Sequence, residues 1–269
     1  MNSILTFIKR HPQVTFWGIA YLTFFLGAFM DALYPSDLWN FVVWGPFLGG
    51  ALVTGIVDGR AGLKTYFSRI VRWRVGLKWY AVALFLPLAM RLVAFGLNIV
   101  SGATLSPNIQ WSAWPDFIME LVIVFFIIAL GEEPGFRGFA LPRLLVGRSA
   151  LAASLILGVL HAIWHLPLFI SGSESPIIIL IIISGAVLIT WLFNNTNGSV
   201  LMVMLLHFSV NLWVGVFNPL FSEADAARQT TWLVVVYIAV AVILVLMTGP
   251  NLARKPAQPE VVGEPVAGV

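Results

Sequence analysis

Long apolar stretches, separated by short polar or turn-forming segments, run through almost the whole chain. A helix needs about 20 apolar residues to cross the ~30 Å hydrocarbon core of a bilayer, and eight stretches reach or approach that length. They cover residues 14–33, 39–57, 79–100, 116–146, 149–170, 176–193, 199–218 and 230–248. The pattern predicts an all-α polytopic membrane protein with about eight transmembrane helices and both termini on the same side.

Composition agrees with this pattern. Of the 269 residues, 59% are hydrophobic and only 10% are charged, and the mean hydropathy is +0.94. A soluble domain carries about 25% charged residues, because charged side chains make up much of a water-exposed surface. These values exclude an ordinary soluble enzyme, a nucleic-acid-binding protein and a disordered chain. The absence of cysteine excludes disulfides, thiolate metal sites and a cysteine nucleophile.

The basic residues give the predicted helices an orientation. Twelve of the fifteen Lys and Arg residues fall in the termini and connectors on one side of the predicted helices, against Arg228 on the other side. The positive-inside rule then places both termini in the cytoplasm, an N-in/C-in topology. We expect an integral protein of a bacterial-type plasma membrane, with a site open to the cytoplasm.

The same pattern divides the chain into four parts. They are N-terminal transmembrane helices (1–115), a helical core rich in polar groups (116–218), a last transmembrane helix (219–248) and a disordered tail (249–269). Within the first part, the basic connector 58–78 contains Tyr66, Phe67 and Trp73. We expect it to be amphipathic and to contact anionic lipid headgroups.

Ionisable residues inside predicted spans are the candidates for function, because each costs at least ~2.5–3.5 kcal/mol near the middle of a bilayer. They are Arg91, Asp116, Glu120, Glu132, Glu133, Arg137, His161, His165 and His207, with Asn211 as a polar neighbour. Asp116 and Glu120 lie near the outer end of their span, where interfacial water can solvate them. For Arg91 we expect a structural ion pair or a side chain that reaches the interface.

Two neighbouring glutamates stand out among these residues. Glu133 and Arg137 are four residues apart and can pair along one helical face, whereas Glu132 points about 100° away from that pair. Pro134 cannot donate a backbone hydrogen bond and should kink the helix beside the glutamates. His161 and His165 share a helical face, as do His207 and Asn211.

These groups should meet at one depth. Glu132 and His165 lie at nearly equal distances along the chain from the predicted turn at 146–149, so an antiparallel pair of helices places them opposite each other. His165 lies ~15 Å from the predicted outer loop, and His207 lies ~12 Å past the inner turn, at a rise of about 1.5 Å per residue. Three spans therefore bring polar groups to the middle of the bilayer.

The residue types fit amide hydrolysis. A buried glutamate can act as a general base on water, a histidine opposite can position that water, and His207 with Asn211 can stabilise an oxyanion. Carboxylate and imidazole groups also suit zinc. The chain has no H-E-x-x-H helix, no pair of aspartates at the inner half of the spans and no convincing serine motif.

The motifs resemble a known family. The segments Glu132-Glu133-x-x-x-Arg137, Trp164-His165-Leu166-Pro167 and His207-x-x-x-Asn211 resemble the three motifs of the CPBP family. This family comprises CaaX proteases and bacteriocin-processing enzymes, is also called Abi, and has the Rce1-type CaaX prenyl endopeptidases as its best-known branch. The resemblance covers about residues 116–215.

By position, the resemblance implies that Glu132 is the catalytic glutamate and that His165 helps to hold the water. It implies His207 and Asn211 as the oxyanion pair, with Glu133 and Arg137 at the remaining motif positions. His161 stands where the family usually has Phe. We expect no obligatory metal, with zinc as the alternative. Its ligands would be Glu132, His165 and His207, with His161 as an optional further ligand.

The leading hypothesis is therefore an intramembrane endopeptidase acting on a membrane-embedded or lipidated protein or peptide, without a nucleic-acid partner. The first alternative is a non-catalytic scaffold, regulator or immunity protein of the same fold. A transporter or channel is the second, although the charges gather at one depth and no pair of broken helices indicates an inverted repeat. The residues leave the identity of the substrate open.

Overall fold

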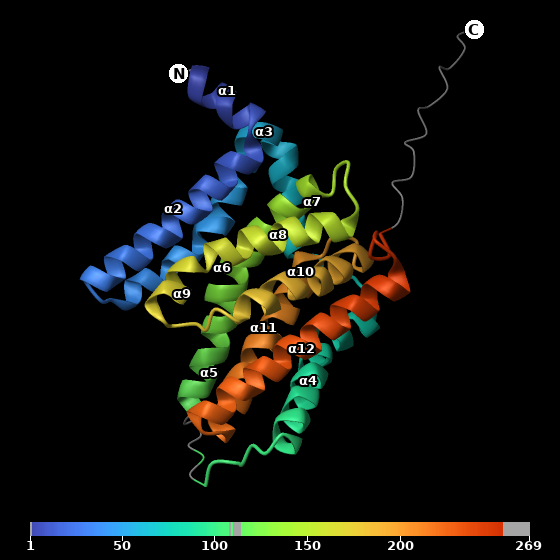
Figure 1. Cartoon of the computed structure of the whole chain (residues 1–269). Helices are drawn as coiled ribbons and strands as arrows, with labels where there is room; N and C mark the ends of the chain where they lie inside the picture. The colour runs from blue at the N-terminus through green and yellow to red at the C-terminus, as the bar shows by residue number, and fades with distance from the viewer. Residues whose placement is uncertain (1, 108, 110–113, 255–269) are drawn as a thin grey trace.

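The computed structural model describes residues 2–254 except for residues 108 and 110–113, and it is an all-α bundle (Figure 1). Its longer helices are α2 (Pro12–Leu33), α3 (Gly45–Ile70), α4 (Leu77–Val100), α8 (Ala150–Trp164), α10 (Ile178–Asn195), α11 (Val200–Phe217) and α12 (Glu223–Thr248). Shorter ones are α1 (Asn2–Arg10), η1 (Asp37–Trp44), α9 (Leu166–Ser171) and η4 (Asn218–Leu220). Between α4 and α8 runs a composite segment of α5 (Trp114–Val122), η2 (Ile123–Ala129), α6 (Leu130–Glu133), η3 (Pro134–Ala140) and α7 (Leu141–Leu144).

Six helical segments of the described chain are long and apolar enough to cross a membrane. They are Pro12–Leu33, Phe41–Ile70, Leu77–Val100, Ile178–Asn195, Val200–Leu220 and Glu223–Thr248. Large apolar side chains on them face outward, among them Leu22, Leu52, Phe85 and Val242. The chain is thus a polytopic membrane protein. The other two predicted spans correspond to the composite segment and to α8, which has 15 residues.

The composite segment changes its winding twice around the two glutamates. The stretches Ile123–Ala129 and Pro134–Ala140 are π-helical, and the short α6 between them carries Glu132 and Glu133. Wide turns of this kind are rare and recur at functional sites. The predicted kink at Pro134 stays a prediction; Pro134 has helical backbone angles, and the second π-helical stretch begins there.

Three helices begin at serine residues that satisfy their free backbone donors. The hydroxyl oxygen of Ser149 accepts a hydrogen bond from Ala152 N at 3.2 Å, and Ser199 does the same for Met202 N at 3.2 Å. Ser222 caps α12 through Asp225 N at 3.3 Å. N-caps of this type contribute typically about 1 kcal/mol each and define where a helix starts. The N-caps Ser149 and Ser199 therefore determine where the turns at 146–149 and 196–199 end.

The basic connector 58–78 is partly helical. Helix α3 continues through it to Ile70 after a break at Gly59, whose φ of 63° is in the left-handed region. Tyr66 does not reach the membrane surface as predicted: it is 2% exposed and donates a hydrogen bond to Phe47 O at 2.9 Å. Phe67 and Trp73 are exposed, as expected for side chains that contact lipid.

The region after α12 is ordered further than predicted. Leu252 is fully buried, and Arg254 donates to Leu145 O at 2.8 Å. The disordered tail was predicted from residue 249, so the packed structure extends at least through Arg254. The remainder of the predicted tail, residues 255–269, lies outside the described residues.

The helices form a layered bundle in which α10 packs between α8 and α12 (Figure 1). The η3 stretch packs closely against α3, and α11 packs against both α4 and η2. Glycines permit the close approach on the α3 side: a Cβ added at Gly131 would lie 2.9 Å from Val43 O, and one at Gly135 would overlap Pro46 O. The composite segment is therefore pressed against α3 and η1 beside both glutamates.

Candidate active site

Glu133 is buried and lies at the centre of a polar cluster. Both of its carboxylate oxygens accept hydrogen bonds from Arg137 NH1, at 3.0 Å and 2.9 Å. His207 Nδ1 on α11 lies 2.7 Å from Glu133 Oε1. Glu133 and Arg137 are 0% and 1% exposed. The predicted pairing at positions i and i+4 is confirmed, and it also holds His207.

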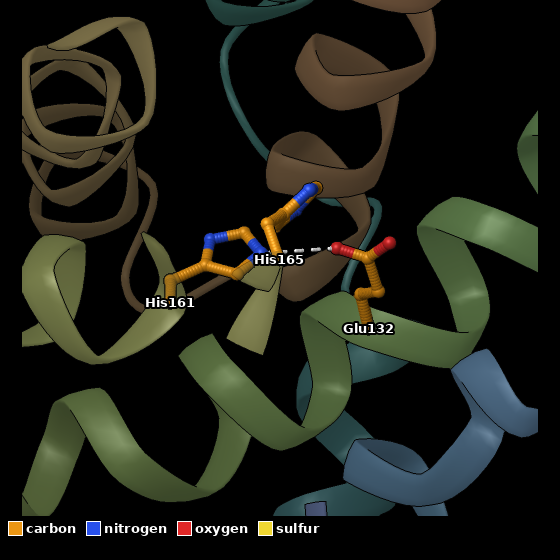
Figure 2. A group of neighbouring side chains, drawn as sticks. All are labelled: Glu132, His161 and His165. Carbon is orange, nitrogen blue, oxygen red and sulfur yellow. Dashed lines mark hydrogen bonds and ion pairs between the residues drawn. The ribbon is translucent and has the colours of Figure 1, made fainter. Parts of the chain in front are cut away.

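Glu132 faces a different helix. His161 Nε2 on α8 lies 3.2 Å from Glu132 Oε2, and both residues are buried. Figure 2 shows His161 and His165, at the end of α8, lying toward the Glu132 carboxylate. Side-chain ligand atoms of these three residues lie within 4.8 Å of one another. The predicted meeting of Glu132 with His165 is confirmed, and His161 is part of the same cluster.

Helix α8 is held in place by α2. Tyr21 donates to Leu160 O at 3.0 Å, and Trp164 Nε1 donates to Ala20 O at 3.0 Å. The Trp164 ring also stacks on Phe24 with ring centroids 3.9 Å apart. Leu160 and Trp164 directly precede His161 and His165, so these contacts fix the position of both histidines relative to Glu132.

Glu174 is a residue of this site that the sequence did not indicate. It lies in the loop before α10, and its Oε2 is 3.0 Å from His165 Nδ1. An acidic residue in a loop cannot be recognised as functional from the sequence, because acidic residues are common in solvent-exposed turns. The only hint was its nearness in sequence to His165. A carboxylate on Nδ1 orients the ring and leaves Nε2 available for other contacts.

Two cavities reach the polar cluster. One of about 630 Å³ is lined by Glu133, Arg137, His161, His165, His207 and Asn211, together with residues of α4, α10 and α12. A second of about 500 Å³ is lined by Glu132, Trp164, His165, His207 and Asn211. The Asn211 side chain makes no hydrogen bond with the described residues. Its amide is therefore free to bind a ligand in either cavity.

Both cavities extend toward one end of the bundle. Their further lining includes Ser173, Glu174 and Asn218, at the ends of helices remote from the cation-rich connectors. The site was predicted to open on the side that carries those cations. The cavity linings differ from that expectation: among the described residues, they lead to the opposite end.

The remaining candidates lie elsewhere. Asp116 and Glu120 are exposed, in line with the predicted interfacial solvation. Arg91 is 3% exposed, so it does not reach an interface, and no carboxylate of the described residues lies within ion-pair distance of it. Ser209, the serine nearest to His207 on α11, is 1% exposed and donates to Leu84 O at 2.7 Å, so it is no candidate for a nucleophile.

Some of these side chains could hold a metal ion. Two groups of ligand atoms lie within 4.8 Å of one another, Glu132–His161–His165 and Glu132–Glu133–His207. Carboxylate and imidazole donors suit zinc. In the second group, Glu133 already accepts from Arg137 and contacts His207. The first group is therefore the more available. It contains the predicted candidates Glu132, His161 and His165, but not His207.

Comparisons with known proteins agree with this geometry. Residues 114–213 match the family described as type II CAAX prenyl endopeptidase Rce1-like. The chain is also 25% identical over 228 residues to CAAX prenyl protease 2 of Methanococcus maripaludis, an alignment that covers 76% of this chain and 84% of the relative. A membrane bundle with a buried Glu/His cluster and these matches is an intramembrane endopeptidase. Over residues 114–213 the chain is similar to the Rce1-like type II CAAX prenyl endopeptidases, which are proteases.

Proposed function

We propose that the enzyme hydrolyses a peptide bond near the C-terminus of a lipidated or membrane-embedded protein. The match to CAAX prenyl endopeptidases favours prenylated protein substrates, because the CaaX motif is a C-terminal sequence whose cysteine carries the prenyl group. The buried Glu132–His161–His165 cluster carries this proposal, since it provides a base beside a cavity at membrane depth.

In the proposed mechanism, Glu132 is the general base. Oε2 contacts His161, and no hydrogen bond to the described residues involves Oε1, so that oxygen can take a proton from a water molecule. His165 positions the water, since Glu174 orients its ring. The resulting hydroxide attacks the carbonyl carbon, and Glu132 then returns the proton to the leaving amine.

His207 and Asn211 stabilise the oxyanion in this mechanism. Glu133 accepts two hydrogen bonds from Arg137 and is therefore a carboxylate, so His207 Nδ1 is the donor in its contact with Glu133. When His207 donates from Nε2 as well, its ring carries both protons and its positive charge faces the oxyanion. The Asn211 amide supplies a second donor one helical turn away.

Glu133 and Arg137 position these groups. Their pair is buried, with one guanidinium nitrogen of Arg137 contacting both oxygens of Glu133, and its role in the proposal is to hold His207 against the cavity. The catalytic core of the proposal is the segment 116–218, with transmembrane helices in 1–115 and 219–248 around it.

We propose that no metal is obligatory, with zinc as the alternative. Zinc would be bound by Glu132, His161 and His165, where it would polarise a water or a carbonyl group. The contact of Glu174 with His165 Nδ1 is the kind of carboxylate support that metal-bound histidines have. Against it, His161 Nδ1 is buried without a partner, so that ring lacks such support.

We also propose eight membrane spans with both termini in the cytoplasm of a bacterial-type cell. The composite segment and α8 are the seventh and eighth spans beside the six long helices. Because the native chain has no cysteine, single cysteines can report the topology. Ser3→Cys should react with a membrane-impermeant maleimide only after cells are permeabilised, and Ser173→Cys should react in intact cells. The reverse pattern would contradict this orientation.

The main test is Glu132→Gln, assayed in liposomes on a prenylated peptide with a C-terminal CaaX sequence. Loss of a general base should lower kcat by about 10²- to 10⁴-fold. The protein should still elute as a folded monodisperse species, because glutamine is nearly isosteric. Wild-type rates in the Glu132→Gln protein would overturn the proposed catalytic role of Glu132. Absence of hydrolysis by the folded wild-type protein would favour a non-catalytic scaffold.

A further inference from the structure

Arg91 of α4 is a buried cation without a counter-charge. Its side chain is 3% exposed, and its hydrogen bond to Asn218 Oδ1 is long, at 3.4 Å. Among the described residues, no carboxylate oxygen lies within 4.0 Å of its guanidinium. A buried arginine with unused donors inside a membrane span is costly and is a candidate for binding an anion.

Arg91 and the catalytic cluster line the same cavity. The cavity of about 630 Å³ has Arg91 and Asn218 in one part of its wall and Glu133, His207 and Asn211 in another. His207, Asn211 and Asn218 follow one another along α11 and η4 at spacings of four and seven residues. At about 1.5 Å per residue, Asn218 lies ~10 Å beyond Asn211 along the helix axis.

Much of the lining of this cavity is apolar, and Thr230 and Tyr237 add hydroxyl groups to it. Ile181, Ile182, Val210, Val214 and Leu233 line it. An occupant should therefore place apolar side chains in the middle, a reacting carbonyl near Asn211 and an anion near Arg91. Three residues of extended peptide span about 10 Å, which matches the distance between the two ends.

We propose that Arg91 and Asn218 bind the free C-terminal carboxylate of the substrate. The proposal rests on the proposed endopeptidase function, and it assigns the cavity to the last three residues of the peptide. The number of residues removed is then set by the distance from Arg91 to the catalytic cluster. Both Arg91 and Asn218 lie outside the segment 114–213 that matches the family.

Three carboxylates, Glu133, Glu174 and Glu223, line this cavity and act against anion binding. Glu133 is paired with Arg137. Glu174 is paired with His165, and Glu223 at the start of α12 is exposed. The net charge near Arg91 therefore depends on Glu223. Replacing Glu223 by Gln should tighten binding of a carboxylate by a few-fold, in the direction opposite to the loss of Arg91.

The test compares two peptides that differ only at the C-terminus, one with a free acid and one with an amide. Binding is measured on the Glu132→Gln background, so that the result does not depend on turnover. The acid should bind about 10- to 100-fold more tightly than the amide, as expected for a charged hydrogen-bonded pair. Arg91→Met should lower the affinity for the acid peptide to that for the amide peptide, and it should leave the affinity for the amide peptide unchanged.

Controls separate this role from a structural one. Arg91→Lys should keep part of the preference for the acid, and Lys78→Met, which removes an exposed cation of the same helix, should keep all of it. Equal binding of acid and amide, or equal weakening of both by Arg91→Met, would overturn the proposal. Binding that responds only to anionic phospholipid in the vesicles would overturn it too, in favour of a lipid phosphate.

Failure of the proposed function has a different signature. If wild-type protein cleaves neither peptide while the acid is still preferred in binding, the endopeptidase assignment fails and the carboxylate site stands. If the wild-type protein cleaves the acid and amide peptides at equal rates and binds them equally, the proposed carboxylate site is overturned and the proposed endopeptidase function is supported.

Discussion

Glu132 and Glu133 are adjacent in sequence but differ in nearly every contact. Glu133 accepts twice from Arg137 and contacts His207, and it is 0% exposed. Among the described residues, Glu132 has one hydrogen-bonding contact, to His161 at 3.2 Å, which leaves its other oxygen unoccupied. Each glutamate lines one of the two cavities. The helix places them about 100° apart, so they face different neighbours.

This difference separates two tasks that one carboxylate cannot perform together. A carboxylate with both oxygens occupied by a guanidinium stabilises the structure but is poorly available to accept a proton from water. A carboxylate with one free oxygen beside a cavity is available for chemistry but contributes less to folding. The following predictions, from the largest effect to the smallest, test this division.

Removing Glu133 should have the largest effect on stability. Glu133→Ala leaves Arg137 buried without its partner, which costs about 3–5 kcal/mol for a pair of this kind. Thermal unfolding in detergent should show a large drop of the midpoint. Glu132→Ala in the same segment should cost much less, and the exposed Glu120→Ala should change the midpoint hardly at all. An equal drop of the unfolding midpoint for Glu132→Ala and Glu133→Ala would contradict the proposed division into a structural and a catalytic carboxylate.

Removing the oxyanion donor should have the next largest effect, on turnover. Asn211→Ala should lower kcat by about 10²- to 10³-fold with little change in KM, because the bond to the oxyanion forms fully only in the transition state. Its stability should match wild type, since Asn211 has no hydrogen bond with described residues. A rise in KM at constant kcat would place Asn211 in substrate binding instead.

Replacing His161 should have the smallest effect. His161→Phe installs the residue usual in the family and should leave kcat within a few-fold of wild type, since Glu132 keeps His165 nearby. Metal analysis of the purified protein and a chelator titration should give the same result for both proteins. If chelation abolishes activity and His161→Phe lowers zinc content, Glu132–His161–His165 is a metal site.

Sequence periodicity and motif spacing predicted the helical spans and the convergence of Glu132, His165 and His207, because each depends on local helical geometry. They did not predict the contact of Glu174 with His165, since that contact depends on how a loop folds back over α8 and the start of α10. The burial of Tyr66 was missed for a similar reason. Its surroundings are set by the approach of η3 to α3, which no local pattern encodes.

Arg91 shows a second limit of sequence reasoning. The sequence predicted that the Arg91 side chain forms an ion pair or reaches the interface, because charged side chains within spans usually do one or the other. Tertiary packing instead places it on the wall of the cavity beside Asn218, 127 positions away in sequence. A contact over that separation follows from the packing of α4 against α11 and α12.

The glycines at positions 131 and 135 divide the walls of the site into a fixed and an adaptable half. Their contacts with Val43 and Pro46 lock the segment carrying both glutamates against α3, and a methyl group at either position would push it away. The opposite wall, with Ile181, Ile182 and Leu233, consists of aliphatic side chains that can be exchanged for others. New substrate preferences can therefore evolve, or be engineered, on α10 and α12 while the reacting groups stay in register.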